Sequence, residues 1–171
     1  MEEKNLIHQF QKGDKSAFDK LVHRHQEWVR LFILKTVGHK EDAEDIAQDV
    51  FVKSYFGLSK FRMESEFNTW LYRIVINHIN NYFRKKKLLS WFSHDLQESN
   101  TPEPTAIEEN QVSELLQHIR KLPRIQRNVM VLRTYQDLPF KEIGNVLSIS
   151  ENSAKVSFHK AKVNLKKFAR G

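Results

Sequence analysis

The chain has 171 residues and a net charge of +7, and 40% of its residues are hydrophobic, which is enough for one ordinary domain or two small ones. With five glycines and four prolines, the composition favours helices over a turn-rich β protein, and the absence of cysteine excludes disulfides and thiolate metal sites. No apolar run approaches the roughly 20 residues that span a bilayer. The opening MEEKNLIHQF is acidic where a secretory signal is basic, so we expect a cytoplasmic protein.

The positive charge is unevenly distributed along the chain. Residues 1–60 hold equal numbers of acidic and basic side chains, residues 61–87 sum to +4, residues 88–119 to −6 and residues 120–171 to +9. Lys and Arg dominate nucleic-acid affinity because they neutralise phosphates. Two basic blocks around an acidic one therefore indicate a polyanionic partner that touches the chain at two separate places.

Apolar residues recur at helical spacing along most of the chain, which predicts an all-α protein. The predicted helices cover about residues 3–11, 16–37, 40–56, 65–87, 106–121 and 124–135, with two more between 139 and 169 separated by Leu147–Ser150. Capping signals are Asp14 or Ser16 and Ser65 at helix starts, and Gly38 and Gly57 at helix ends.

The periodicity fails from about Leu88 to Ala106, where HDLQESNTPEPT is polar, acidic and contains two prolines. Such a composition is typical of a linker. We therefore expect two small helical domains, residues 1–87 and 107–171, joined by an acidic flexible linker over residues 88–106. The apolar segment from Leu88 to Phe92 is unusual for a linker, and the sequence assigns it no role.

The C-terminal segment predicts a helix-turn-helix. A short apolar-faced helix over Phe140–Leu147 is followed by a turn with an inward Ile149, and Ser150 can cap a longer basic helix. That second helix would enter the major groove of DNA. Base-edge contacts are predicted for Asn152, Ser153, Lys155, Val156 and His159, with Lys160, Lys162 and Lys166 nearer the phosphates. An ordinary basic helical hairpin is the alternative for this segment.

The sequence FKEIGNVLSISENSAKVSFHKAKVNL resembles region 4 of the extracytoplasmic-function sigma factors, which recognises the −35 promoter element. LPRIQRNVMVLRTYQDL before it resembles the helix that opens that region. The family has glycine in the turn, Gly-Thr-Val before a basic residue, and an arginine two positions later. In this chain these positions are occupied by Ser148 in the turn, by Asn152-Ser153-Ala154 before Lys155, and by Ser157. The resemblance implies the same scaffold but does not fix the −35 preference, because Ser157 stands where an arginine could grip DNA.

A second segment, EDAEDIAQDVFVKSY, resembles region 2.2, with which sigma factors bind the clamp helices of the polymerase β′ subunit. Glu41, Asp45, Gln48, Asp49 and Val52 are three or four positions apart and share one helix face. Carboxylates in the first turns of a helix suit its dipole, and on their own are usually just solvated. Because Asp45, Gln48 and Asp49 match the family's contact positions, the resemblance implies that this face binds RNA polymerase core.

A third segment, FNTWLYRIVINHINNYFRKKK, resembles regions 2.3 and 2.4, which open and read the −10 promoter element. Flat side chains can replace lost base stacking, and cations can neutralise the separated backbone. The resemblance implies −10 contacts from Lys60, Phe61, Arg62, Phe67, Trp70, Tyr72, Arg73, Asn77 and Arg84 to Lys87, with a flipped-out base held by the loop from Leu58 to Glu66. An aromatic stripe at helical spacing is also typical of a core, and we expect Leu71, Ile74 and Val75 to be buried.

These resemblances cover about residues 5–87 and 107–168, in the family's order. They imply a sigma factor that binds RNA polymerase core through the β′ clamp helices and the β flap, directs initiation at promoter DNA, and is held by an anti-sigma factor. They imply no catalytic activity and no small-molecule substrate. We expect no metal and no cofactor, since the sequence lacks a phosphate loop, a metalloprotease motif and a nucleophile elbow.

Two rival functions remain open at this level. A helix-turn-helix repressor or activator that acts without polymerase would explain the basic C-terminal block, but would leave Asp45, Gln48 and Asp49 without a role. A DNA-processing enzyme is disfavoured because no acid cluster with metal-ligand spacing lies beside a basic groove.

Overall fold

The computed structural model describes residues 2–93 and 110–168, and every regular element in these two ranges is an α-helix. The helices are α1 (Glu2–Gln11), α2 (Ser16–Val37), α3 (Lys40–Leu58), α4 (Phe67–Ser93), α5 (Asn110–Lys121), α6 (Arg124–Gln136), α7 (Phe140–Leu147) and α8 (Glu151–Phe168). The all-α prediction is confirmed. None of these helices is long and apolar enough to cross a membrane.

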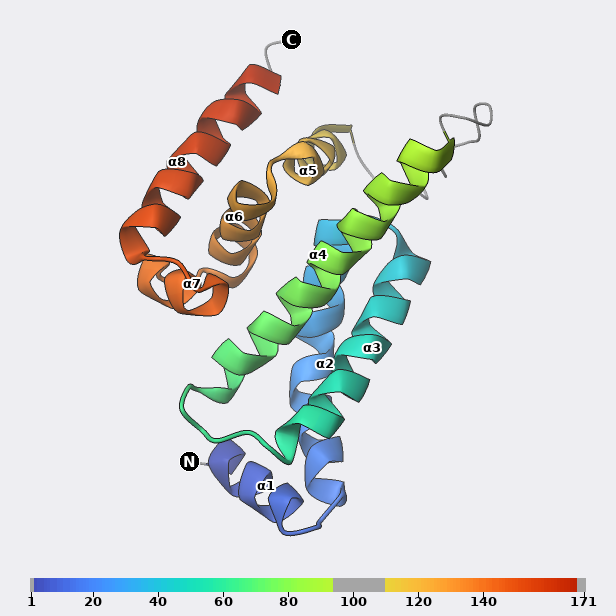
Figure 1. Ribbon diagram of the computed structural model, residues 1–171, viewed down its shortest axis with the longest axis vertical. Coiled ribbons are helices and arrows are strands. Elements are labelled where there is room, and N and C mark those ends of the chain that lie inside the picture. Colours follow the sequence, from blue (N-terminus) through green and yellow to red (C-terminus); the bar gives the residue numbers. More distant parts are fainter. Residues whose placement is uncertain (1, 94–109, 169–171) are drawn as a thin grey trace.

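Helices α1 to α4 pack around a common apolar core. In Figure 1, α2, α3 and α4 run side by side and α1 lies across one end of them. Each long helix turns an apolar stripe inward, because its hydrophobic residues recur every three or four positions. The stripes include Val29 and Phe32 of α2, Val50 of α3, and Val75 and Ile79 of α4, all of which are fully buried.

Short-range signals in the sequence set several helix ends. The Oδ1 atom of Asp14 accepts hydrogen bonds from the backbone N–H of Ser16 at 3.0 Å and from its hydroxyl at 2.7 Å, just before α2. Gly38 ends α2 with a φ of 88°, and its N–H donates to the carbonyl of Leu34. The hydroxyl oxygen of Ser150 accepts the N–H of Ser153 at 3.0 Å at the start of α8. These three caps agree with the sequence-based predictions.

Three predicted helix limits differ from the structure. Helix α3 continues through Gly57 to Leu58, so this glycine does not end the helix. A Cβ at Gly57 would lie 3.0 Å from the ring of Trp70, so the missing side chain makes room for that ring. Helix α4 begins at Phe67, and the carbonyl of Glu66 accepts the first hydrogen bond, so Ser65 is not its cap. The same helix extends to Ser93 and includes the first six residues assigned to the linker. Lysine and leucine are good helix formers, and no proline interrupts this stretch.

Helices α5 to α8 form a second group that packs on the first. Ala154 and Ala161 of α8 are fully buried and let this helix approach α6 and α7 closely. Figure 1 shows α7 beside the N-terminal part of α4, and α5 and α6 also contact α2. We call α1–α4 the N-terminal half and α5–α8 the C-terminal half. Their contact places the helix-turn-helix next to the helix predicted to read the −10 element.

Candidate protein and nucleic-acid interfaces

The outer face of α3 carries the side chains predicted to bind polymerase. Glu41, Asp45, Gln48, Asp49 and Val52 are all exposed. On the opposite face of the helix, Ala43, Ile46, Ala47 and Val50 are buried against the neighbouring helices. The helix therefore presents these five side chains on one accessible surface, which we call the α3 face.

The remaining carboxylates of α3 have partners within the chain. Asp42 accepts a hydrogen bond of 2.8 Å from the hydroxyl of Tyr82, and Glu44 lies 3.4 Å from Arg30. Burial and this carboxylate raise the pKa of Tyr82 well above its ordinary value. Asp42 and Glu44 thus hold α3 against its neighbours, whereas Glu41, Asp45 and Asp49 point to solvent.

The α3 face also includes Phe56, which was not predicted from the sequence. Phe56 lies one helical turn after Val52, and 70% of its surface is exposed, as is 56% of Val52. Exposed apolar side chains next to carboxylates are typical of a protein-binding surface. The spacing of four residues from Val52 is the signal that could have identified Phe56.

The loop between α3 and α4 is held in place by α1. The side-chain amide of Gln11 donates hydrogen bonds to the carbonyl oxygens of Leu58 at 3.1 Å and Phe61 at 2.9 Å. Lys60 and Arg62 point outward, and Arg62 lies 3.8 Å from Glu64 at the surface. The cationic residues predicted to contact the −10 element are therefore accessible in this loop.

The aromatic residues predicted to contact separated strands behave differently. Phe61 and Phe67 are buried, and Trp70 is half-buried with its ring centroid 5.0 Å from Phe61 and 5.6 Å from Phe67. Tyr72 is also buried. In this conformation the four rings contribute to the core and its edge, so Phe61, Phe67 and Tyr72 cannot stack on a base unless the loop and the C-terminal half move. Leu71 and Val75 are buried as expected, and Ile74 is half-buried.

Polar side chains of α4 hold the C-terminal half. The guanidinium of Arg73 donates to the carbonyl of Asn145 in α7 from Nε at 3.2 Å and from Nη2 at 2.7 Å. The hydroxyl of Tyr72 donates to Gln136 at 2.9 Å, and the amide of Asn128 donates to Asn80 at 3.2 Å. Arg73, a predicted −10 contact, is therefore occupied by a backbone carbonyl of the helix-turn-helix.

The start of α8 presents the predicted base-reading side chains to solvent. Asn152, Ser153, Lys155, Val156, His159 and Lys160 are all exposed. The amine of Lys155 forms a 2.7 Å ion pair with Glu151, and this hydrogen bond lowers the pKa of the Glu151 carboxyl. In the turn before α8, Ser148 adopts a left-handed φ of 56°. A Cβ on Gly144 would lie 2.7 Å from the carbonyl oxygen of Ile149, so glycine lets the turn close tightly on α7.

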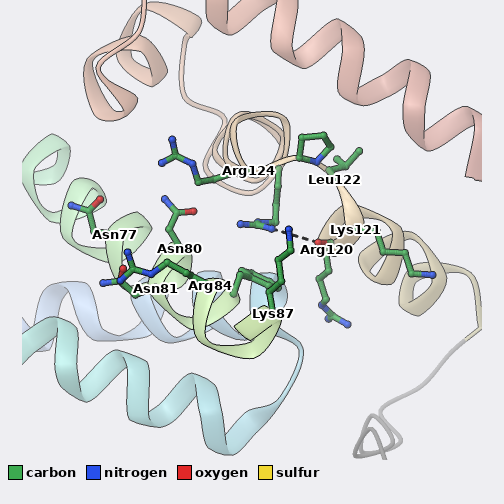
Figure 2. A pocket seen from close by; sticks show the side chains of 12 residues that line it. Asn77, Asn80, Asn81, Arg84, Lys87, Arg120, Lys121, Leu122 and Arg124 are labelled. Carbon is green, nitrogen blue, oxygen red and sulfur yellow. Dashed lines mark hydrogen bonds between the residues drawn. The ribbon is translucent and has the colours of Figure 1, made fainter. Parts of the chain in front are cut away.

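A basic cleft lies between α4 and the corner where α5 meets α6 (Figure 2). Its volume is about 940 Å³. We call it the α4–α5/α6 cleft, and it is lined by Asn77, Asn80, Asn81, Phe83, Arg84, Lys87, Arg120, Lys121, Leu122, Pro123, Arg124 and Arg127. It brings the predicted −10 contacts Asn77, Arg84 and Lys87 together with four basic residues of α5 and α6 for which the sequence predicted no role. No cluster of His, Asp and Glu suited to a metal ion occurs in the described ranges.

Both halves of the chain match models of known protein families. Residues 21–88 match Sigma-70 region 2, and residues 113–165 match Sigma-70 region 4. The first match spans α3 and most of α4, and the second spans the helix-turn-helix and the helices before it. The family matches thus cover the α3 face, the predicted −10 contacts and the exposed start of α8.

Curated proteins show the same likeness over nearly the full length. The chain is 31% identical to the ECF RNA polymerase sigma factor SigW of Bacillus subtilis, over 96% of this chain and 95% of that protein. It is also 31% identical to the RNA polymerase sigma-H factor of Pseudomonas aeruginosa, with 85% and 82% of the two chains covered. For the ECF sigma-E factor of Escherichia coli K12 the identity is 31%, over 83% and 81%.

Solved structures share the fold. CnrH, solved in complex with the cytosolic domain of CnrY, superposes with a TM-score of 0.73 at 22% identity, covering 99% of this chain and 98% of that one. The sigma factor RpoE from Bartonella quintana, solved with the anti-sigma factor NepR, gives a TM-score of 0.69 at 19% identity, covering 90% and 96%. The arrangement of eight helices in the described ranges is therefore shared with structures of very different sequence.

Proposed function

The chain belongs to the extracytoplasmic-function sigma factors of the sigma-70 family, and from this membership we propose which of its surfaces binds RNA polymerase core and which bind promoter DNA. As a sigma factor it directs the polymerase to promoters. We further propose that it performs no covalent chemistry itself and acts in the cytoplasm, where the bacterial polymerase works.

The α3 face is the proposed polymerase contact. It combines exposed carboxylates at Asp45 and Asp49 with the exposed apolar side chains of Val52 and Phe56. An apolar centre with charges beside it supplies both affinity and the electrostatic match that selects a basic partner. This accessible mixed face is the observation that supports a protein partner, and it distinguishes the proposal from a helix-turn-helix regulator that acts alone.

Promoter DNA is proposed to bind at two surfaces. The exposed start of α8, with Asn152, Lys155 and His159, would read the −35 duplex in the major groove. The opened −10 strand would be bound by the loop residues Lys60 and Arg62 and by one side of α4, which carries the half-buried Arg73 and the exposed Asn77 and Arg84. Trp70 at the edge of the core would stack on an unpaired base once Phe61 and Phe67 are rearranged.

The two halves must separate before both surfaces can bind promoter DNA. Arg73 is bonded to Asn145, Tyr72 to Gln136 and Asn80 to Asn128 in the described conformation. We therefore propose that this is a closed state, in which the C-terminal half covers part of the −10 surface. Binding to core polymerase would stabilise the open state, since a partner shifts an equilibrium toward the conformation that it prefers.

The polymerase contact can be tested by pull-down with core enzyme. Asp45→Lys should weaken retention by at least tenfold, because it reverses one charge at the centre of the interface. Glu27→Lys on the exposed side of α2 makes the same change away from the α3 face and should bind like the wild type. Equal binding of all three proteins would contradict the α3 face. Run-off transcription with added core tests the whole function, and no promoter-specific product from the host's own genomic templates would refute it.

An anti-sigma factor is also a proposed partner. CnrH was solved with CnrY and the Bartonella quintana factor with the anti-sigma factor NepR, and both share this fold. By analogy, the partner would bind this chain and prevent it from joining core polymerase. Copurification from the host, with a competition against core polymerase, would test this regulation.

A further inference from the structure

We propose that the α4–α5/α6 cleft is a binding site for a compact polyphosphate, which would contact both halves of the chain at once. The inference deepens the proposed function, because Asn77 and Arg84 on one wall are also proposed −10 contacts. Figure 2 shows the α4 side chains on one side of the cleft and those of α5 and α6 on the other.

The positive charge of the cleft indicates an anionic ligand. Of the twelve described residues that line it, six are basic and none is acidic. Arg84 and Lys87 come from α4, and the others are Arg120, Lys121, Arg124 and Arg127. Like charges that face one another across a cleft repel, and an anion between them turns the repulsion into attraction. The three asparagines of α4 add amide donors on the same wall.

Arg127 is the second, independent sign of a missing ligand. The residue is 6% exposed, and its Nε has no hydrogen-bond partner among the described residues. Its guanidinium stacks 3.9 Å above the ring centre of Phe83, and Nη1 makes only a long 3.5 Å contact to the carbonyl of Arg120. Burial, together with the positive charge of Arg124, lowers its pKa to about 10. A buried cation without a counter-charge is costly, so an anion in the cleft would supply the partner that Arg127 lacks.

The arrangement favours several linked phosphates over other anions. Guanidinium groups match phosphate oxygens with two parallel hydrogen bonds, and six cations on two walls require more than one phosphate to balance them. Phe83 is the one aromatic residue among the lining residues, and Arg127 covers its face. The described lining residues therefore leave no aromatic face free for a nucleobase to stack on, and recognition would depend on the phosphates themselves.

Occupancy would affect the closed state. An anion held by Arg84 on one wall and by Lys121 and Arg124 on the other adds a bridge between the two halves. It would therefore favour the conformation in which α7 holds Arg73, and oppose binding of the −10 strand by the same surface. A polyphosphate would thereby act as an inhibitor of promoter binding.

The test is calorimetric titration of the full-length chain with inorganic tripolyphosphate at low salt. The double variant Lys121→Gln/Arg124→Gln removes two charges from the cleft, and Lys12→Gln/Lys15→Gln removes two exposed charges near the turn between α1 and α2. We expect the cleft variant to bind about tenfold more weakly or worse, and the control to bind like the wild type. A separate titration with ATP distinguishes the source, because tighter binding than tripolyphosphate would indicate a nucleotide and equal or weaker binding the inorganic chain.

Three results would overturn the proposal: no binding by the wild type, equal binding by both double variants, or citrate binding as tightly as tripolyphosphate. Arg127→Gln provides a second variant, which should also weaken binding while its thermal unfolding curve reports whether it is folded. Run-off transcription by the wild type without added anion separates the two claims. Promoter-specific product together with no tripolyphosphate binding refutes only the cleft proposal, whereas tripolyphosphate binding without any promoter-specific product refutes the proposed function.

Discussion

Gly38→Ala should destabilise the chain by more than the backbone alone explains, because two separate features meet at this residue. Gly38 has a φ of 88°, where an L side chain costs about 1–2 kcal/mol. A Cβ there would also collide with the guanidinium of Arg120, which must then move. The displaced Arg120 would lose its 3.3 Å hydrogen bond to the carbonyl of Thr36, worth about 1 kcal/mol. The expected total is roughly 2–3 kcal/mol.

Gly13→Ala is the matched control for the backbone contribution. Gly13 has a φ of 105°, but nothing lies within 4 Å of the position that its Cβ would take. We expect this variant to lose about 1–2 kcal/mol, the cost of positive φ alone. For a chain of this size each kcal/mol lowers the melting temperature by about 2–4 °C. Urea unfolding of both alanine variants should therefore show a difference of about 1 kcal/mol between them.

A double-mutant cycle with Arg120→Ala isolates the contact. In the Arg120→Ala background, Gly38→Ala should cost no more than Gly13→Ala does in the wild type, so the coupling energy should be about 1 kcal/mol. If the two glycine variants lose equal stability and Gly38 shows no coupling to Arg120, then α5 does not dock on the end of α2 as described.

Three further predictions concern DNA binding and pH. Lys155→Ala should weaken binding of a −35 duplex by about 1 kcal/mol or more in a gel-shift titration, because a cation near the bases is lost, and unchanged affinity would argue against α8 as the reading helix. Trp70→Ala should spare duplex binding but impair strand opening, so permanganate reactivity of −10 thymines should fall; normal reactivity in a variant that is still folded would contradict this role. Burial raises the pKa of Tyr72 from 10.0 to about 12, and Glu142 adds to the shift. The neutral hydroxyl is the form that donates to Gln136, so its stabilisation of the closed state is fully present below pH 10 and lost as the pH rises through about 12. Absorbance titration of the wild type against Tyr72→Phe should show this late ionisation, and its absence would indicate that Tyr72 is exposed.

Helix content and helix order could be read from the sequence because local patterns determine them. The apolar stripes of α2 to α4 and the caps at Asp14, Gly38 and Ser150 act within a few residues. The prediction that Gly57 ends a helix was wrong, because the role of this glycine depends on tertiary packing and not on its neighbours in the sequence. Its missing side chain makes room for Trp70, which is brought there by the packing of α4 on α3.

The exposure of the candidate side chains could be predicted from the sequence only in part. The residues of the α3 face and the start of α8 are exposed where helical spacing placed them. Burial of Phe61, Phe67 and Tyr72 could not be read from sequence, because a ring at helical spacing fits either a core or a base. Contact between the halves was also not predictable, since Arg73 and Arg120 bond to backbone carbonyls, which carry no sequence signal.

The bond from Arg73 to the carbonyl of Asn145 makes two tasks compete for one side chain. If Arg73 also binds the −10 strand as proposed, its guanidinium can either stabilise the closed state or bind promoter DNA, but not both at once. A substitution at Arg73 would therefore destabilise the closed state and weaken binding of the −10 strand together. Mutations that favour the open state without weakening promoter binding should therefore arise at other contacts between the two halves. Substitution of the Asn145 side chain alone should not open the chain, because Arg73 bonds to the backbone carbonyl of this residue.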